Sequence, residues 1–461
     1  MSGTKISPGV KDMTTGSPGK LIFRFALSLM LGNVFQQLYT FADTMIVGRC
    51  LGVNALAALG ATEWLTFMMF GCVQGITQGF SISISQKFGK HDRQGLEKDV
   101  VHSAYLSIGT ALILTAAGLL LCRPVLQLLK TPEDIIGLSF AYLKILYGGV
   151  AVSVFYNLLA AILRAIGDSW APLKAVTAAS LCNIFLDIVF VAVFHWGIQG
   201  AAFATMISQA AAALYCLAVL WKMNFIKPDK ASRKPDISCI RHLLALSLPI
   251  GLQNMITGTG GIIVQSVING FGILFIAGFT AANKLYGLLE IAASSYGYAV
   301  ASYTGQNMGA GLLNRIRKGL KDASVLGILT AYVMSFIMLV FGKRILGCFV
   351  TGDVEAVEQT IAVGYEFLII LAIFFPLLYL LYILRSCIQG MGNTVLPMIS
   401  SMVQLFMRVG CALFLTEMIG QRGVFFGEIL AWTGADILLF FAYLYQMKKM
   451  KSRKTVTLPQ L

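Results

Sequence analysis

Charged residues are scarce in this sequence: they make up 12% of its 461 residues, whereas 57% are hydrophobic. A soluble globular protein is about a quarter charged, because its surface faces water. Residues 104–121 and 323–341 contain no Asp, Glu, Lys, Arg or His. Stretches of this length cross the hydrocarbon core of a bilayer, which is about 30 Å thick. The composition therefore excludes a soluble protein and predicts an integral membrane protein.

Motifs for nucleotide binding and catalysis are also missing. The sequence has no glycine-rich phosphate loop with its lysine, and no histidine pair at metal-hydrolase spacing. Its nine cysteines include no C-x-x-C pair, and its four histidines lie near loops or the ends of predicted spans. We therefore expect no enzyme, no ATP-driven pump and no cofactor.

Apolar segments of spanning length recur along the chain and predict twelve membrane helices. The first 20 residues are polar and lack the apolar run of a signal peptide, so the span that begins at Leu21 is expected to be retained. The predicted spans are 21–47, 54–84, 100–121, 136–160, 172–194, 198–221, 242–269, 275–304, 322–342, 359–384, 395–416 and 422–446.

The net charge of +14 reflects Lys and Arg residues whose positions indicate membrane topology. It therefore does not imply a nucleic-acid partner. These basic residues gather in the connections 87–98, 227–234 and 315–321 and in the C-terminal tail, whereas residues 195–197 and 270–274 have none. Positively charged connections face the cytoplasm. An even number of spans then places both termini in the cytoplasm.

A weak internal repeat divides the chain into two halves. AIGDSWAP at 165–172 matches GMGNTVLP at 390–397, and Gln86 and Gly89 match Gln306 and Gly309 at an offset of 220. Six spans per half give both halves the same orientation. We predict an all-α membrane protein of two six-helix lobes related by a pseudo-two-fold axis along the membrane normal. Its parts are an N-terminal cytoplasmic tail (1–20), an N-lobe (21–222), a cytoplasmic linker (223–240), a C-lobe (241–446) and a basic cytoplasmic tail (447–461).

Ionisable and polar residues at membrane depth are costly and therefore mark candidate sites. In the N-terminal half these are Asp43 in the first span, Asn183 and Asp187 in the fifth, and Thr205 in the sixth. Asn183 and Asp187 are four residues apart and share one helix face. All four offer oxygen atoms, which suit protons and alkali cations.

The C-terminal half has fewer such residues, with Glu290 in the eighth span and Arg408 in the eleventh. The two either neutralise one another or lie beside a water-filled cleft. Tyr39, Phe155 and Tyr156 offer aromatic faces to an organic cation. Aromatic residues are 11% of this chain, however, so packing is the alternative role for these three.

Several segments together resemble the MATE (multidrug and toxic compound extrusion) transporters. The first two helices of that family are similar to FADTMIVGRCLG at 41–52, followed by ALAALG and SQKFG. Its fourth and fifth helices resemble LRAIGDSWAPL at 163–173 and NIFLDIVF at 183–190. The opening of its second half resembles SLPIGLQ at 247–253 and GQNMGAG at 305–311. The resemblance extends over essentially the whole chain.

The resemblance implies a monomeric multi-pass transporter of the bacterial inner (plasma) membrane, surrounded by lipid. It would export cationic amphipathic small molecules in exchange for protons or sodium ions. Asp43, Asn183, Asp187 and Thr205 match the N-lobe cation or proton site of the family, and Asn157 matches its polar fourth-helix residue. Tyr39, Phe155, Tyr156 and Asn157 are the residues expected in the substrate cleft.

The chain departs from one branch of the family, because its seventh span has no acidic residue. It looks closer to the branch named for a DNA-damage-inducible member, which couples through the N-lobe. Two alternatives stay open: a lipid-linked oligosaccharide flippase of the same superfamily, favoured by Arg408, and a membrane scaffold without transport. Buried Asp43 and Asp187 argue against both.

Overall fold

The computed structural model describes residues 10–223, 229–348 and 354–456, and almost all of these are helical. Among these residues there is no β-strand, so the predicted all-α membrane fold is confirmed. Parts of the predicted tails and linker, namely residues 1–9, 224–228 and 457–461, lie outside the described residues.

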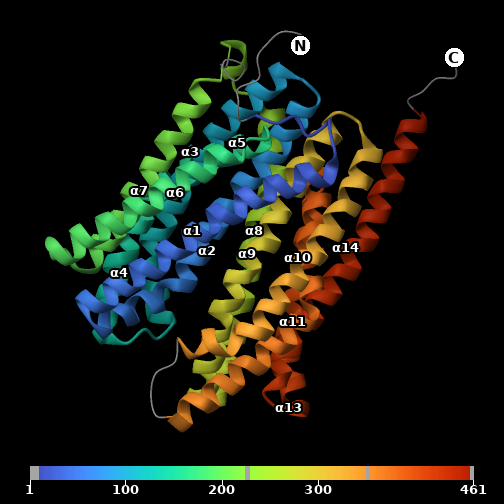
Figure 1. Ribbon diagram of the computed structural model, residues 1–461. Helices are drawn as coiled ribbons and strands as arrows, with labels where there is room; N and C mark the ends of the chain where they lie inside the picture. The colour runs from blue at the N-terminus through green and yellow to red at the C-terminus, as the bar shows by residue number, and fades with distance from the viewer. Residues whose placement is uncertain (1–9, 224–228, 349–353, 457–461) are drawn as a thin grey trace. The chain divides into compact units, whose positions relative to one another are not determined.

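The N-terminal half contains long helices joined by short turns (Figure 1). The helices are α1 (Pro18–Leu51), α2 (Val53–Gly89), α3 (Arg93–Leu128), α4 (Glu133–Gly148), α5 (Val150–Ala165), α6 (Trp170–Asp187) and α7 (Gly197–Trp221). A π-helical segment, Ile188–Val193, continues α6 without a break. A short 3-10 turn, Ala231–Arg233, precedes the second half.

The C-terminal half repeats this pattern. Its helices are α8 (Ile237–Ile268), α9 (Ile273–Gly309), α10 (Leu313–Gly347), α11 (Val354–Gly390), α12 (Val395–Gly410), α13 (Thr416–Ile419) and α14 (Arg422–Val456). A 3-10 turn, Asn269–Phe271, joins α8 to α9, and a second π-helical segment, Cys411–Leu415, follows α12. Each half therefore has a π-helical segment within its fifth membrane span.

Nine of the described helices are long and apolar enough to cross a membrane. The pair α4 and α5, bent by 48°, forms a tenth span, and α8 and α9, with 32 and 37 residues, complete the expected twelve. The predicted fourth span, 136–160, lies within this bent pair. The bend lies at Gly149, where a Cβ atom would overlap the side chain of Met206.

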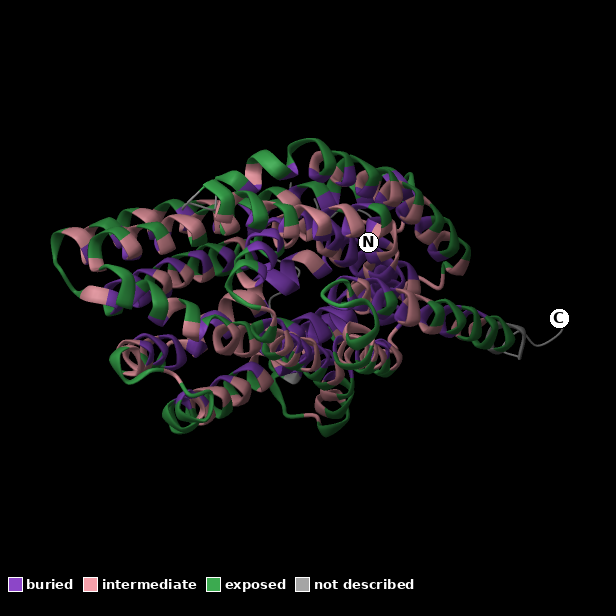
Figure 2. Ribbon diagram, turned by 90° about the horizontal axis from the view of Figure 1, so that it is seen from below, coloured by how far each residue is buried: buried purple, intermediate pink, exposed green. Residues whose placement is uncertain are grey.

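Many helices show exposed residues on one side and buried residues on the other (Figure 2). Helix α10 illustrates how the sequence separates a lipid-facing side from a packing side. Leu329, Val333 and Phe336 follow one another at helical spacing and are 56–62% exposed. On the opposite side the helix buries small residues four apart, including Gly319, Ala323, Gly327 and Ala331. Small residues let helices approach closely, and α10 packs along α11. An exposed apolar stripe on a helix of this length is the surface expected to face lipid.

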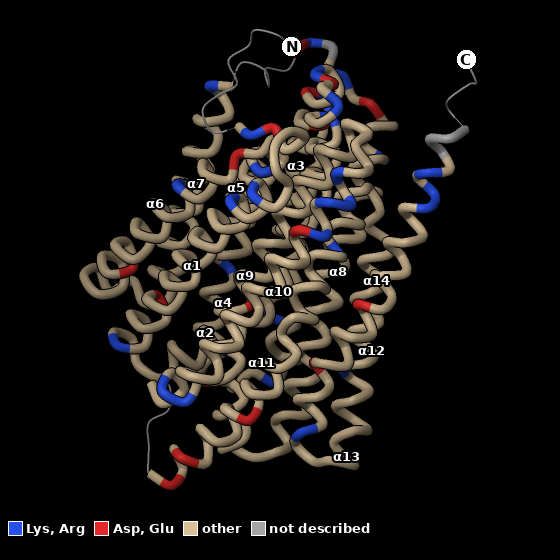
Figure 3. Tube along the Cα trace, turned by 45° about the vertical axis from the view of Figure 1, so that its right-hand side comes forward, with Lys and Arg blue, Asp and Glu red and all other residues tan. Residues whose placement is uncertain are grey.

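Charged residues concentrate near the helix ends and leave long uncharged stretches between (Figure 3). The chain divides into two compact units. Unit 1 contains residues 27–255 with short segments at 1–15 and 305–311, and unit 2 contains 256–304, 312–461 and 16–26. In unit 1, α2 packs against α3, α4 and α5, and α7 against α5 and α6; in unit 2, α14 packs against α11 and α12.

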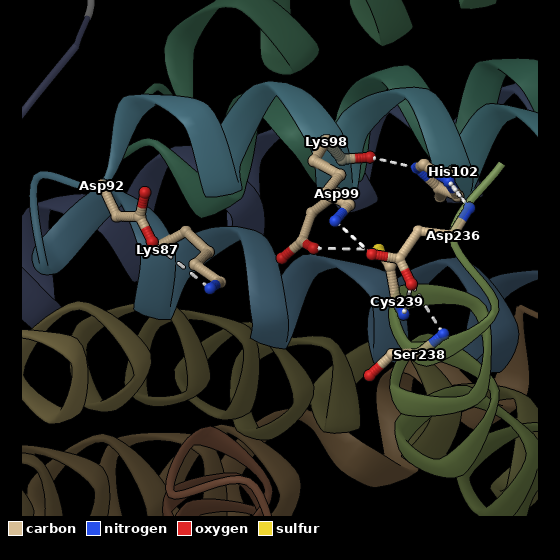
Figure 4. Close-up of polar contacts among 8 residues, drawn as sticks. All are labelled: Lys87, Asp92, Lys98, Asp99, His102, Asp236, Ser238 and Cys239. Atoms are coloured by element: carbon tan, nitrogen blue, oxygen red, sulfur yellow. Dashed lines mark hydrogen bonds and ion pairs between the residues drawn. The ribbon is translucent and has the colours of Figure 1, made fainter. Parts of the chain in front are cut away.

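The chain segment that precedes α8 is fastened to α3 by a polar cluster (Figure 4). Asp236 forms an ion pair with Lys98, and its backbone N–H donates to His102 Nε2 at 2.9 Å. The other ring nitrogen of His102 lies 2.8 Å from the carbonyl oxygen of Lys98. A carbonyl only accepts and a backbone N–H only donates, so His102 is neutral with its proton on Nδ1.

Asp99 completes this cluster. It accepts hydrogen bonds from Ser83 at 2.6 Å and from the Cys239 thiol at 3.4 Å. The Lys98 ammonium group, with backbone hydrogen bonds from Ser238 and Cys239, lowers the pKa of Asp236 to about 2. Residues 236–239 are therefore attached to α3, and through Asp99 to α2, within unit 1.

Candidate functional site

Helix α6 carries the polar residues at the centre of the candidate site in unit 1. Asn183 and Asp187 lie one helical turn apart and are 1% and 0% exposed. Asp187 is the last residue of α6, directly before the π-helical segment. π-helical turns are rare and frequently occur at functional sites.

Asn183 links α6 to α7. In the amide orientation that satisfies both neighbours, it donates to Asp187 Oδ2 at 3.1 Å and accepts from the backbone N–H of Thr205 at 3.2 Å. The second carboxylate oxygen of Asp187 is buried and has no hydrogen-bond partner among the described residues. Oδ2 of Asp187 thus has a protein partner in this orientation, whereas Oδ1 remains available to a ligand.

Asp43 on α1 adds a second carboxylate to the site. Its side chain is 7% exposed, and Oδ1 has no hydrogen-bond partner among the described residues. It lies within electrostatic range of Asp187, Tyr39 and Tyr142. In the described part of the chain, no Lys, Arg or His forms an ion pair with either carboxylate. Two buried carboxylates without a cation require compensation by a proton or a positively charged ligand.

A pocket that is partly open to solvent lies beside these groups in unit 1. Tyr39, Asn183 and Thr205 contribute to its wall. These residues also contact or lie near the two carboxylates, so they form the boundary between pocket and carboxylates. The remaining wall is mainly polar or aromatic and includes Gln36, Tyr156, Ser180, Ser208 and Gln209.

The structure places the other sequence-predicted cleft residues differently. Tyr156 lines the pocket, as Tyr39 does. Asn157 is partly buried, and its amide donates to the Ser153 carbonyl of its own helix at 2.9 Å. Phe155 is partly buried and is not among the residues of the pocket wall. The contribution of α5 to the pocket is therefore Tyr156.

Sequence reasoning missed several polar residues of this site. Gln36 lies three residues before Tyr39, and that spacing alone would place it on the same face of α1. Gln209 lies four residues after Thr205 in the same way, and it accepts a hydrogen bond from Ser153. The sequence did not identify Tyr142 as a site residue, because a tyrosine within an apolar span is usually a packing residue.

In unit 2 the predicted residues Glu290 and Arg408 each have another partner. Arg408 Nη2 lies 2.7 Å from Glu428 Oε2, and the hydroxyl of Tyr382 donates to Glu290 Oε1 at 2.7 Å. The suggestion that Glu290 and Arg408 neutralise one another directly is therefore corrected. Glu428 lies on α14, which packs against α12, and this places its carboxylate within reach of Arg408.

The internal repeat relates these residues to the site in unit 1. The 225-residue offset of the AIGDSWAP repeat aligns Asn183 with Arg408. Gly197 and Gly200 recur as Gly420 and Gly423 at an offset of 223, which aligns Thr205 with Glu428. The C-terminal half therefore has an ion pair where the N-terminal half has a neutral amide and a threonine.

Comparisons with known proteins agree with this architecture. A family model described as MatE matches residues 28–189 and 249–413. "Probable multidrug resistance protein YpnP" of Bacillus subtilis is 29% identical over 95% of this chain and 98% of its own length. A "FAD transporter" of Shewanella oneidensis is 24% identical over 74% of this chain and 76% of its own length. A solved structure described as "Crystal structure of MATE in complex with MaL6" has a TM-score of 0.90 at 24% identity, covering 97% of this chain and 100% of that one.

Proposed function

This chain belongs to the MATE family of multi-pass membrane transporters, and from that premise we propose that it exports cationic amphipathic small molecules in exchange for protons or sodium ions. The observation that carries the proposal is the pair Asp43 and Asp187, buried beside a pocket with no cation of the described protein paired to them. The relative named as a multidrug resistance protein supports the class of cargo.

The chemistry of exchange follows from charge. A carboxylate pair in a low-dielectric site is stable when a proton, a sodium ion or a cationic cargo compensates it. Asn183 and Thr205 supply further oxygen atoms of the hard type that sodium prefers. Because one site is neutralised by either ligand, binding of the ion weakens binding of the cargo. That competition is the thermodynamic requirement for antiport.

The pocket supports a cargo with both an aromatic or apolar body and a positive charge. Tyr39 and Tyr156 offer ring faces, and a cation over such a face gains roughly 0.5–2 kcal/mol. Gln36, Ser180 and Gln209 offer hydrogen bonds without a charge. No Lys or Arg is among the residues of the pocket wall, so an anionic cargo would find no counter-charge there.

The flippase alternative finds no support in the relatives reported above. The FAD transporter does make an anionic cargo the second candidate, because FAD carries phosphates. We favour the cationic cargo, since both charged groups of the unit 1 site are acidic.

We infer a location in the bacterial plasma membrane with both termini in the cytoplasm, on the basis of the Lys and Arg distribution and the bacterial relatives. We propose that it functions as a monomer, of the branch that couples through the N-lobe.

Inside-out vesicles separate these possibilities. They should accumulate a fluorescent organic cation when a proton or sodium gradient is imposed without ATP. Accumulation of FAD with no accumulation of the cation would favour the second candidate. Uptake of either compound that needs ATP and survives ionophores would refute antiport.

A further inference from the structure

Unit 2 contains a second buried cluster of charged side chains, distinct in sequence from the site in unit 1. Its members are Glu290 on α9, Arg385 on α11, Arg408 on α12, and Glu428 and Asp436 on α14. Arg385 is central, because Asp436, Glu290 and Arg408 all lie within its electrostatic range. The Tyr382 ring lies 6.0 Å from its guanidinium carbon.

Two of the three acidic groups already have a partner. Glu428 forms the 2.7 Å ion pair with Arg408, and both side chains are largely buried. Glu290 accepts the hydrogen bond from the Tyr382 hydroxyl at 2.7 Å. A hydroxyl that donates to a carboxylate stabilises the ionised form of that carboxylate. Glu428 and Glu290 therefore each have a hydrogen-bonding partner.

Asp436 and Arg385 have no such partners, although their charges are opposite. Both carboxylate oxygens of Asp436 are buried without a hydrogen-bond partner among the described residues. Arg385 is 7% exposed, and its Nε and Nη2 atoms likewise lack a partner among those residues. Each lies within electrostatic range of the other, but the described residues contain no ion pair between them.

The charges of the cluster indicate what Asp436 binds. With every group ionised, the three acids and two arginines would leave one buried negative charge uncompensated. An uncompensated buried carboxylate is far more costly than a neutral carboxyl group. One proton makes the cluster neutral, and Asp436 is the acid without a donor or a cation on it.

We propose that Asp436 is a second proton-binding site of this transporter, protonated while it is apart from Arg385 and ion-paired with Arg385 once the proton has left for water. Arg385 on α11 is the charged group that acts on Asp436 directly. Tyr382 on α11, Arg408 on α12 and Glu290 on α9 lie within electrostatic range of Arg385, and Tyr286 on α9 and Glu428 on α14 lie within that of Glu290. The two arrangements differ in the contact between α11 and α14, so proton binding biases how these helices pack.

This inference rests on the proposed function, because it assigns a further site to ion-driven antiport. Its test therefore reads the proton directly, without transport. The full chain is reconstituted in lipid with Asp43→Asn and Asp187→Asn, so that the carboxyl groups of unit 1 do not contribute. Infrared difference spectra across pH should then show the carbonyl stretching band of a protonated carboxyl group in a dry environment.

Further substitutions in that background assign the band. Asp436→Asn should remove it, whereas Glu290→Gln should retain it, and so should Glu417→Gln, a control at an exposed acid of α13. Survival of the band in the Asp436→Asn protein, or its loss in the Glu290→Gln protein, would overturn the proposal.

A measurement on the wild-type chain covers the case in which these variants fail to fold. Dicyclohexylcarbodiimide adds to protonated carboxyl groups in apolar surroundings, and peptide mass mapping should find the adduct on Asp436. Modification of Asp43 or Asp187 with none at Asp436 would refute the second site. An adduct at Asp436 in a protein that shows no gradient-driven exchange would instead refute the proposed function and leave the proton site standing.

Discussion

Gly309 lies directly against the backbone of Gln86, so closely that a Cβ atom on Gly309 would overlap the Gln86 carbonyl oxygen. The contact is reciprocal, because a Cβ atom on Gly89 would overlap the carbonyl oxygen of Gln306. All four residues belong to unit 1. They are also the four positions that the internal repeat equates at an offset of 220. Equivalent positions of the two repeats therefore contact each other, with the glycine of each repeat against the glutamine of the other.

Alanine at either glycine should destabilise the protein. Overpacking a close contact costs roughly 1–3 kcal/mol, which exceeds the gain of about 0.5–1 kcal/mol that alanine brings within a helix. Gly309→Ala and Gly89→Ala should each lower the thermal unfolding midpoint. Gly287→Ala and Gly109→Ala are matched controls, since nothing lies within 4 Å of a Cβ atom at those positions. Equal midpoints for test and control variants would contradict this contact.

Asp43→Asn should reduce gradient-driven export of the organic cation to the rate of empty vesicles. Asparagine keeps the shape of the side chain but cannot change charge when the ion or cargo binds. Expression and the unfolding midpoint should stay near those of the wild type, because Asp43 Oδ1 holds no hydrogen bond among the described residues. Glu63→Gln, at an exposed acid on α2, is the control. Wild-type export with unchanged pH and sodium dependence would show that Asp43 is not a coupling residue.

Breaking the ion pair of Arg408 and Glu428 should be costly from either side. The side chains are 16% and 17% exposed, and removal of one member of a buried pair costs roughly 3–5 kcal/mol, with the lower end expected for partial exposure. Arg408→Gln and Glu428→Gln should therefore lower the unfolding midpoint strongly. The double variant Arg408→Met, Glu428→Leu should lose less, because neither charge is left alone. Additive losses in the double variant would mean that the pair is not coupled.

The stabilisation that the ion pair of Asp236 and Lys98 gives should depend on pH. The pKa of Asp236 is lowered from 3.8 to about 2 in the folded protein, so its contribution is fully present above 3.8 and is lost as the pH falls through about 2. Pepsin cleavage within residues 229–239 should rise over that window. In Asp236→Asn the segment should already be cleaved faster at pH 3.8, whereas Asp134→Asn, at an exposed acid of α4, should match the wild type. A cleavage rate that stays constant across this pH range would show that the ion pair of Asp236 and Lys98 does not protect the segment.

The Lys and Arg distribution predicts the orientation of the chain. A cysteine at Lys234 should react with a membrane-impermeant thiol reagent only in inside-out vesicles. A cysteine at His195, in a connection without Lys or Arg, should react only in intact cells. Both are introduced into a variant whose native cysteines are replaced. The reverse pattern would invert the topology, and labelling of both from one side would contradict the single span, 198–221, predicted between them.

Much of the fold could be predicted because a bilayer imposes simple rules on a chain. Length, apolarity and charge identify the spans, and the predicted sixth span, 198–221, nearly coincides with α7, Gly197–Trp221. The bend at Gly149 could not be predicted in the same way. It depends on the approach of Met206 from α7, a tertiary contact that no local pattern contains.

The candidate site could be predicted in part for a related reason. Asn183 and Asp187 stand out because helical spacing puts them on one face, and a hydrogen bond joins them in the Asn183 amide orientation that satisfies both of its neighbours. Their role in coupling stays a prediction. Asp436 was missed although it lies at membrane depth inside the predicted twelfth span, and what the sequence could not show is that it faces Arg385 on α11. Assigning Glu428 rather than Glu290 to Arg408 requires the packing of α12 on α14.

The two π-helical segments, Ile188–Val193 and Cys411–Leu415, have a consequence for how such sites change over time. A π-helical turn accommodates one more residue than an α-helical turn. Exchange of such a turn for an α-helical one at unchanged chain length would rotate one flanking part of the helix by about 100° relative to the other, whereas loss of one residue there would restore α-helical geometry with both parts in register. The side chains that follow Asp187 and Gly410 can therefore turn to another helix face without any change in chain length, when these segments exchange π-helical for α-helical hydrogen bonds.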